Sequence, residues 1–325
     1  MLMVRMLPWS WDAILALCLA VMIDIVLGEP PLRLHPTVWM GRLIDVEYRF
    51  GRKLGPAMQK AYGVVLAIGV IGVFAGASYA FLQLVNRLSI EPIQIIITAI
   101  LLKSTFSIRM MREYASDLAA AIRRSDYTEA RSILRNIVRR DPASLSDTQV
   151  ISAGVETIAE GIGDGIASPL FYYALFGVPG AFAYRAINTL DSMVGYKDPE
   201  FANLGWFSAR LDSVANWLPA RLASILMLLS GKLLGESASR SWRILLRDRN
   251  RTESWNAGWL MSTMAGLLGV KLEKPGFYTL GDADQQLNYA HLNRAVRIMT
   301  LDTILFVLVL ILVILAMGWV ADIVR

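Results

Sequence analysis

The sequence predicts an all-α, polytopic integral membrane protein with about four full spans plus re-entrant or buried central helices. Hydrophobic residues make up 55% of the 325 residues, charged residues only 18%, and the mean hydropathy is +0.47. A soluble domain averages about 45–50% apolar and about 25% charged residues, because its surface must stay polar. No run of any length alternates with the period of two that is typical of a half-buried strand. The composition excludes intrinsic disorder, and the lone Cys18 excludes an intrachain disulfide.

Four segments predict membrane spans. A helix rises 1.5 Å per residue, so about 20 residues are needed to cross the hydrocarbon core. The clearest are 62–85, whose glycines permit close helix approach, and 301–321, which ends on an interfacial Trp319. A shorter span at 93–108 contains Lys103. The predicted spans are 11–28, 62–85, 93–108 and 301–321.

Positive charge predicts the orientation of these spans. Of the 32 Lys and Arg residues, 24 fall in 29–61, 109–141 and 232–300, so we expect these stretches on the cytoplasmic side. The net charge of +5 reflects such loops better than it reflects nucleic-acid binding. Segments 166–190 and 213–234 are also apolar, but prolines and an arginine interrupt the first and the second is short. We expect both to be re-entrant or buried rather than full crossings.

Common nucleotide-binding and nucleophile motifs are missing. Gly231-Lys232 lacks the flanking residues of a P-loop, and the glycines of 161–165 do not follow a strand, as a dinucleotide fingerprint would. The chain has two histidines, His35 and His291, and one cysteine. This inventory argues against a zinc site and against a Cys/His nucleophile.

An acidic block is the first candidate site. Glu156, Glu160 and Asp164 are four residues apart, so a continuous helix would place them on one face. Like charges at this spacing repel by about 0.2–0.5 kcal/mol per pair, and a cation would remove that repulsion. Carboxylate oxygens suit Mg²⁺. A solvated face, or pairing with Arg139 and Arg140, is the alternative.

A second cluster of polar residues lies at 184–197. Arg185, Asn188 and Ser192 share a helical face, and Asp191 lies next to it. Such groups are costly in apolar sequence unless they are paired, and within membranes they are functional candidates by default. The alternative is an internal Arg–Asp pair that holds helices together.

A third cluster lies at 205–221. Asp212 and Asn216 are one helical turn apart, and Arg210 and Arg221 flank them. The arginines offer cations for phosphate or carboxylate beside a carboxylate that can bind metal. A juxtamembrane arginine pair that meets lipid phosphates is the alternative, and it leaves Asp212 and Asn216 unexplained.

A proline-braced loop at 28–41 follows the first predicted span. Pro36 favours an extended backbone at His35. A lone histidine is more often structural than catalytic, but its position at a membrane exit makes His35 a candidate at the rim of a site.

Together these blocks resemble the adenosylcobinamide-phosphate synthase family, the CbiB/CobD membrane enzymes of cobalamin biosynthesis. The resemblance covers most of the chain and is most specific over 184–222. The matching blocks are LGEPP and HPTVWMG near the start, ETIAEGIGDGIASPLFYYALFG at 156–177, YRAINTLDSMVGYK at 184–197, GWFSARLDSVANWLPARL at 205–222, NAGW at 256–259 and FYTLGD at 277–282. The chain departs from the family pattern at Gly161, at 251–255 and at Leu260.

The resemblance implies an ATP-dependent amide ligase that joins adenosylcobyric acid to aminopropanol or its O-phosphate, giving adenosylcobinamide (phosphate). It implies Mg²⁺, ATP as co-substrate, a corrinoid substrate and a multi-pass location in the cell membrane. Partners would be a second copy of the chain or other corrinoid-pathway enzymes. Amide formation in water needs an activated carboxylate, and metal-bound phosphates and cationic clamps suit that chemistry.

We expect one domain over 1–325, with a catalytic region at 109–300 on the cytoplasmic side. The expected catalytic residues are Asp164, Asp191, Asp212 and His35. The expected substrate- or phosphate-binding residues are Arg185, Asn188, Ser192, Lys197, Arg210, Asn216, Arg221 and Asn256. The expected metal ligands are Glu156, Glu160 and Asp164. All should converge on one cavity that opens toward the cytoplasm.

Two other functions stay open. A non-enzymatic membrane sensor or regulator resembling AmpE would make the polar clusters dispensable. A transporter for corrinoid or another anion would show an inverted repeat and full crossings at 166–190 and 213–234. The sequence contains no detectable repeat.

Overall fold

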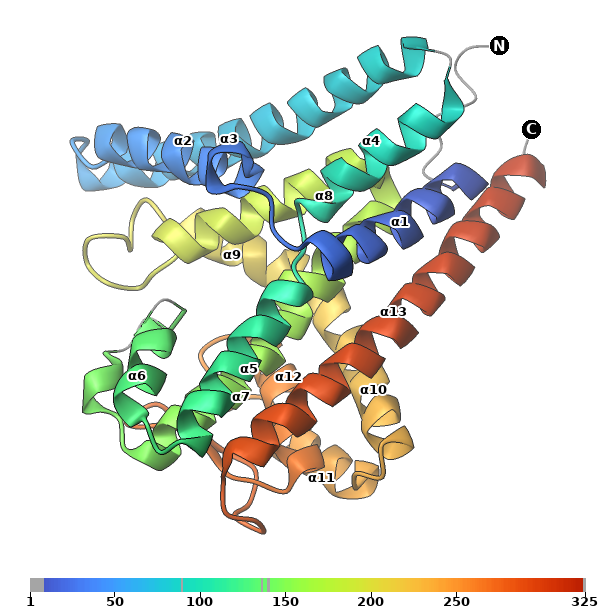
Figure 1. The fold of residues 1–325 in the computed structure, drawn as a ribbon. Helices are drawn as coiled ribbons and strands as arrows, with labels where there is room; N and C mark the ends of the chain where they lie inside the picture. Colours follow the sequence, from blue (N-terminus) through green and yellow to red (C-terminus); the bar gives the residue numbers. More distant parts are fainter. Residues whose placement is uncertain (1–8, 89, 136, 139–140, 324–325) are drawn as a thin grey trace. The chain divides into compact units, whose positions relative to one another are not determined.

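The structure is a computed structural model that describes residues 9–88, 90–135, 137–138 and 141–323 (Figure 1). It is mostly helical, which confirms the predicted fold class. The chain forms two compact units, each assembled from segments that are distant in the sequence. Unit 1 comprises Met1–Ser107, Ser168–Asn216 and Leu308–Arg325, and unit 2 comprises Ile108–Ala167 and Trp217–Val307. The expectation of one domain over the whole chain stays a prediction.

Unit 1 is a set of packed helices. Its elements are α1 (Trp11–Leu27), η2 (Leu32–Leu34), α2 (Pro36–Gly51), α3 (Pro56–Val85), η3 (Asn86–Leu88), α4 (Glu91–Lys103), α8 (Ser168–Val194), α9 (Trp206–Ala215) and the end of α13 (Tyr289–Ile323). Helix α8 packs against α3, α9, α2 and α4, while α1 packs along α4. Helix α8 is therefore central to unit 1, which places the residues of 184–194 among several neighbours.

Helix α8 is interrupted at Gly177. This residue has a φ of 69° and a ψ of −162°, a conformation that glycine adopts readily and other residues do not. Pro179 follows and cannot donate a backbone hydrogen bond. The Tyr173 hydroxyl, one turn before the break, donates to the carbonyl oxygen of Ala13 at 2.8 Å and ties α8 to α1.

Unit 2 surrounds a buried helix, α12 (Trp255–Leu268), which packs against α11, α10 and α7. Eleven of its residues are buried, so it reads as a core helix. The other elements are α5 (Arg109–Arg123), α6 (Tyr127–Arg135), η4 (Pro142–Ser144), α7 (Asp147–Gly161), the π-helical η5 (Ile162–Ala167), α10 (Trp217–Leu233), α11 (Ala238–Asp248), the hairpin strands β1 (Leu272–Lys274) and β2 (Tyr278–Leu280), and the start of α13. The strands are antiparallel, with Leu272 opposite Leu280.

Among the described residues, three helical stretches are long and apolar enough to cross a membrane. They are Pro56–Leu88, Asp147–Val194 and Tyr289–Ile323, and the pair α9 and α10, bent by 43°, makes a fourth if it is one span. The predicted spans 62–85 and 301–321 lie within the first and third stretches. Three or four candidates agree with the predicted number of spans.

The other two predicted spans form shorter helices than a crossing needs: 11–28 matches α1 to within one residue, whereas α4 ends at Lys103, five residues before the end of the predicted 93–108. Helix α1 has 17 residues and α4 has 13, both fewer than the roughly 20 that a crossing needs. Conversely, the segment 166–190, which we expected not to cross, belongs to a stretch that meets the length and apolarity criterion. That stretch is interrupted by the π-helical η5 and by Gly177, so it is not one regular helix.

A buried ion cluster joins α1 to α4 in unit 1. The ammonium of Lys103 lies 3.0 Å from an oxygen of Asp24 and 2.8 Å from an oxygen of Glu29. The Asp24 side chain is 0% exposed and the Lys103 side chain 4%. Burial raises the pKa of Glu29, but hydrogen bonds with His35 and Lys103 outweigh it, so the pKa lies below its ordinary value. Lys103, which lies in a predicted span, thus has one acidic partner on α1 and another in the segment that follows α1.

In unit 2, Asp248 connects α11 to the segment after β2. Its carboxylate lies 2.8 Å from Nε of Arg247 and 3.1 Å from Nη1 of Arg251, and accepts a hydrogen bond of 2.8 Å from the amide of Gly281. Burial raises the pKa of Asp248, but the Arg247 and Gly281 hydrogen bonds and the nearby positive charges hold it below its ordinary value. Because the folded-state pKa is lowered, this carboxylate stabilises the fold above its unfolded pKa and stops doing so as the pH falls through its folded pKa.

We predict that Lys103→Met lowers the free energy of unfolding by about 3–5 kcal/mol, because it leaves buried carboxylates without their cation. The double variant Asp24→Asn/Lys103→Met should recover part of that loss. The measurement is the Tm of the purified protein in detergent. Lys53→Met, at an exposed lysine of unit 1, is the control and should change the Tm little. A Tm for Lys103→Met equal to that of the control would contradict the ion cluster.

We also predict that Asp248→Asn lowers stability at neutral pH by about 1–3 kcal/mol, because a buried charge-assisted network loses its acceptor. The wild-type protein should lose this contribution below about pH 4, near the ordinary carboxyl pKa, whereas the variant has none to lose. The test compares Tm values between neutral and acidic pH. Asp282→Asn, which alters an exposed partner of Arg247, is the matched control. Parallel pH curves for Asp248→Asn and wild type would refute the assignment.

Candidate functional site

Two of the polar motifs meet in unit 1. The Asn216 side-chain amide donates to Oδ1 of Asp212 at 3.0 Å, and Asn188 also forms a hydrogen bond with the Asp212 carboxylate. Asp212 lies on α9, Asn216 is the residue that ends it, and Asn188 lies on α8. The packing of α8 against α9 therefore brings the second and third predicted clusters together. We call Asp212, Asn188, Asn216 and Arg185 the Asp212 network.

Asn216 is held in one orientation. It is 1% exposed, and its Oδ1 accepts hydrogen bonds from the hydroxyls of Ser168 at 2.6 Å and Tyr184 at 2.8 Å. The ring of Tyr184 stacks on Tyr172, with centroids 5.4 Å apart. Because the carbonyl side of the amide is occupied by donors, its NH₂ group faces Asp212. The orientation of the Asp212 carboxylate is thus set by groups that are themselves fixed.

Arg185 links the Asp212 network to the first turn of α2. Its Nη1 lies 3.4 Å from Oδ1 of Asn188, and its Nε lies 3.4 Å from the hydroxyl of Thr37. Both contacts are long for hydrogen bonds between a guanidinium and a neutral oxygen. The Thr37 amide donates in turn to Nδ1 of His35 at 3.2 Å.

His35 uses both ring nitrogens within the protein. Nδ1 accepts from Thr37 as the cap of α2, and Nε2 lies 3.0 Å from Glu29, which also contacts Lys103. Accepting at Nδ1 places the proton of neutral imidazole on Nε2, where it is donated to Glu29. The geometry thus favours a structural task for His35, fixing the start of α2 near Arg185. Its expected catalytic role stays a prediction.

The other predicted residues of unit 1 lie nearby in the chain. Asp191 is half-buried on α8, and Gly195 leaves room for its carboxylate, since a Cβ there would come within 2.1 Å of Oδ1. Ser192 donates to the carbonyl oxygen of Asn188 at 2.8 Å. Lys197 and Arg210 are exposed. Their expected roles are not decided by these positions.

Arg221 and Asn256 meet in unit 2, where α10 packs against α12. Nη1 of Arg221 donates to Oδ1 of Asn256 at 3.2 Å. The guanidinium carbon of Arg221 lies 4.3 Å from the ring centroid of Trp217 and 4.9 Å from that of Trp259. We call Arg221, Asn256, Trp259 and Arg249 the Trp259 cluster, because Arg249 contacts the same ring.

The three expected metal ligands lie in different surroundings, and their role as ligands stays a prediction. Among the described residues, no three His, Cys, Asp or Glu side chains lie close enough to hold a metal ion. Glu156 is buried and accepts hydrogen bonds from Ser152 at 2.6 Å and Tyr278 at 2.9 Å, so it connects α7 to strand β2 of the hairpin. Glu160 is exposed, and Asp164 lies in the π-helical η5. The prediction assumed one regular helix, and the π-helical turn breaks that spacing.

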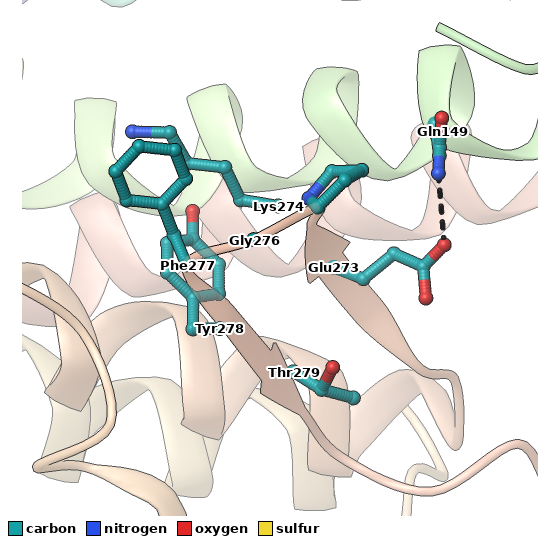
Figure 2. Close-up of a pocket in the computed structure, with 8 residues that line it drawn as sticks. Gln149, Glu273, Lys274, Gly276, Phe277, Tyr278 and Thr279 are labelled. Atoms are coloured by element: carbon teal, nitrogen blue, oxygen red, sulfur yellow. Dashed lines mark hydrogen bonds between the residues drawn. The ribbon is translucent and has the colours of Figure 1, made fainter.

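A pocket of about 390 Å³ lies along the hairpin of unit 2 (Figure 2). Figure 2 shows Gln149, which donates to Glu273 at 3.2 Å, beside the turn that carries Phe277. Hydrogen bonds from Lys271 and Gln149 lower the pKa of Glu273. None of the predicted site residues lines this pocket. The lining residues are Gln149, Glu273, Lys274, Pro275, Gly276, Phe277, Tyr278 and Thr279.

The sequence did not identify several residues that the structure places at these clusters. Ser168 and Tyr184 orient Asn216. Glu29, which is paired with Lys103, contacts His35. Arg249 lies against the Trp259 ring that Arg221 also contacts. Only Lys103 carried a signal of its own, because a cation in an apolar segment requires an acidic partner. The expected convergence of all site residues on one cavity stays a prediction.

Comparison with known proteins gives consistent matches. A family described as CobD/Cbib protein matches residues 17–304. A probable cobalamin biosynthesis protein CobD of Methanothermobacter thermautotrophicus is 44% identical over 292 residues, covering 90% of this chain and 95% of the relative. CobD of Dehalococcoides mccartyi is 41% identical, covering 83% and 87% of the two chains, and the cobalamin biosynthesis protein CbiB of Salmonella typhi is 37% identical, covering 88% and 92%.

No solved structure shows a significant match to the chain. The family model covers most of the sequence, and the relatives match it over nearly their whole length. These matches confirm the resemblance that the motifs indicated. The chain therefore belongs to the CobD/CbiB family of cobalamin biosynthesis proteins.

Proposed function

We propose that this protein is a multi-pass enzyme of the cell membrane that forms an amide bond in cobalamin biosynthesis. The reaction joins adenosylcobyric acid to aminopropanol or its O-phosphate and consumes ATP, giving adenosylcobinamide (phosphate). The observation that carries this proposal is the Asp212 network, where a carboxylate, two amides and an arginine from separate motifs meet in an apolar fold. Polar groups in such surroundings are costly, which supports a functional task.

The Asp212 network suits the proton transfer of amide formation. ATP converts the corrinoid carboxylate into an acyl phosphate or acyl adenylate, the amine nitrogen attacks its carbonyl carbon, and phosphate or AMP leaves. The nitrogen must lose a proton as the C–N bond forms. Asp212, oriented by Asn188 and Asn216, is the group that we propose accepts it. Arg185 can hold the carboxylate or a phosphate oxygen through charge-assisted hydrogen bonds.

The described residues can hold Mg²⁺ only together with the phosphates of a bound nucleotide. Mg²⁺ requires oxygen ligands and commonly uses one or two carboxylates together with substrate phosphates and water. No group of three acidic side chains forms a cage of its own in the described chain, so a single carboxylate, such as that of Asp164, would supply one ligand. A magnesium ion held in this way screens phosphate charge.

A transporter is the second candidate, and the interrupted helices favour it. Transporter sites commonly lie at discontinuous helices, and α8 breaks at Gly177 while α9 and α10 meet at 43°. The two functions differ in their use of ATP. A ligase consumes ATP only when corrinoid acid and amine are both present, whereas transport and AmpE-like regulation need no such coupling. The purified protein in detergent, assayed with each substrate omitted in turn, separates them.

We predict that Asp212→Asn lowers the rate of amide formation at least about 100-fold, because the amide cannot accept the proton. Arg185→Ala should also lower it, with the larger effect on KM if the guanidinium holds substrate. Product is measured by chromatography of the corrinoids, and Tm values show whether each variant is folded. Asp45→Asn, at an exposed carboxylate of α2, is the control. A folded Asp212→Asn protein with near-normal rates would remove Asp212 from the mechanism.

Asp191 and Arg210 remain to be tested by the same assay. We predict that Asp191→Asn and Arg210→Ala each reduce amide formation, since their motifs resemble those of the family most closely. Normal rates in both variants, alongside a large loss in Asp212→Asn, would confine the reaction to the Asp212 network.

A further inference from the structure

Two arginines of unit 2 lie beside one indole ring. The guanidinium carbons of Arg221 and Arg249 are 4.9 and 5.1 Å from the ring centroid of Trp259. Within the described residues, neither side chain has a carboxylate within 4.0 Å, whereas Arg294 in the same unit pairs with Glu236 at 2.6 Å. The ring attracts each cation but does not neutralise it. The Trp259 cluster therefore holds two positive charges close together without an acidic partner.

The NAGW segment builds this arrangement residue by residue. Oδ1 of Asn256 accepts from Arg221 and fixes its position. Gly258 has no side chain, and a Cβ there would come within 2.1 Å of the carbonyl oxygen of Arg249. The backbone at Arg249 can therefore lie directly on the first turn of α12, which brings its side chain to Trp259. The cluster thus depends on the amide, the glycine and the ring of one short motif.

The position on α12 adds positive potential. Ser254 caps this helix by accepting from the amide of Ala257 at 3.3 Å, so Asn256 lies in the N-terminal turn and Trp259 in the next. The N-terminus of a helix carries a partial positive charge that favours anions. Two guanidinium groups, each with a planar set of N–H donors, match the oxygens of phosphate.

We propose that Arg221, Arg249 and Trp259 form a binding site for a polyphosphate anion. This proposal rests on the proposed function for one point, the identification of the anion in the cell as the phosphate chain of ATP. Arg221 and Arg249 bind phosphate oxygens, Asn256 positions Arg221, and the indole ring keeps both guanidinium groups oriented. An anionic lipid headgroup shares the phosphate chemistry, and the experiment separates the two sources.

Binding is measured by equilibrium dialysis on the full-length protein in nanodiscs of phosphatidylcholine, with ATP and inorganic tripolyphosphate as probes and with neither corrinoid nor amine present. Arg249→Ala and Arg221→Ala should each raise the Kd about 10- to 100-fold, the value of a charge-assisted hydrogen bond. Arg249→Lys, which keeps the charge but loses the planar donor set, should give a smaller rise. Arg243→Ala, at an exposed arginine of α11, is the matched control and should leave the Kd unchanged.

Each outcome supports or overturns the site. Equal Kd values in wild type, Arg221→Ala and Arg249→Ala overturn it, as does a wild-type protein that binds neither probe. A third outcome is that ATP binding disappears when the nanodiscs contain phosphatidylglycerol and returns when they do not. This result would show that lipid headgroups compete at the site, and it would overturn ATP as the ligand in the membrane. The Tm of each variant reports folding, and Gly258→Ala should reproduce the Arg249→Ala loss if the backbone approach positions Arg249.

The binding readout keeps this proposal separate from amide formation. A protein that binds ATP through Arg249 yet forms no amide would refute the proposed reaction and leave the phosphate site standing. A protein that forms the amide while Arg249→Ala binds ATP normally would refute the phosphate site alone.

Discussion

A charged or polar group inside an apolar fold must be paired, and this constraint shapes both units. Asp24, Lys103 and Glu29 satisfy it as an ion cluster, and Asp212 satisfies it through Asn188 and Asn216. Asp24 and Lys103 come from α1 and α4, and Asp212 and Asn188 from α9 and α8, so pairing them requires particular helix packing. The polar residues therefore specify which helices meet, in addition to any chemistry that they perform.

Helix α8 combines these requirements in unit 1. Arg185 contacts the first turn of α2, and Asn188 contacts the carboxylate of Asp212 on α9. Tyr184 and Ser168 orient Asn216. A displacement of α8 would disturb all of these contacts at once. Rigid support of this kind is what a reactive carboxylate needs, because its geometry must hold to a fraction of an ångström.

Much of the fold could be predicted from the sequence, because composition and apolar runs report burial directly. The spans at 62–85 and 301–321 were predicted in this way. Helix ends were harder to predict: α1 ends within one residue of the prediction, but α4 ends at Lys103, five residues before the predicted span ends. The segment 166–190 was harder still, because apolar sequence does not distinguish a crossing from a buried core helix.

Contacts between candidate site residues on one helix could be predicted from their spacing. Contacts between residues on different helices or loops could not. Arg185 and Asn188 share a face of α8, as their spacing predicted, and Asn216 reaches back one turn to Asp212. The metal-ligand role of the acidic block stays a prediction, although a π-helical turn changes the spacing of its carboxylates and Glu156 accepts a hydrogen bond from Tyr278. The contact of Arg249 with Trp259 depends on a loop conformation that no periodicity reports.

The shortness of α4 has a consequence for the ion cluster at its end. Helix α4 has 13 residues and so measures about 20 Å, less than a hydrocarbon thickness of about 30 Å. It exposes an apolar stripe of Ile93, Ile96 and Ile100, yet ends on Lys103, whose side chain is 4% exposed. A helix of this length cannot reach water on both sides of a bilayer by itself. Neutralisation of Lys103 by Asp24 and Glu29 therefore allows the helix to end inside the protein.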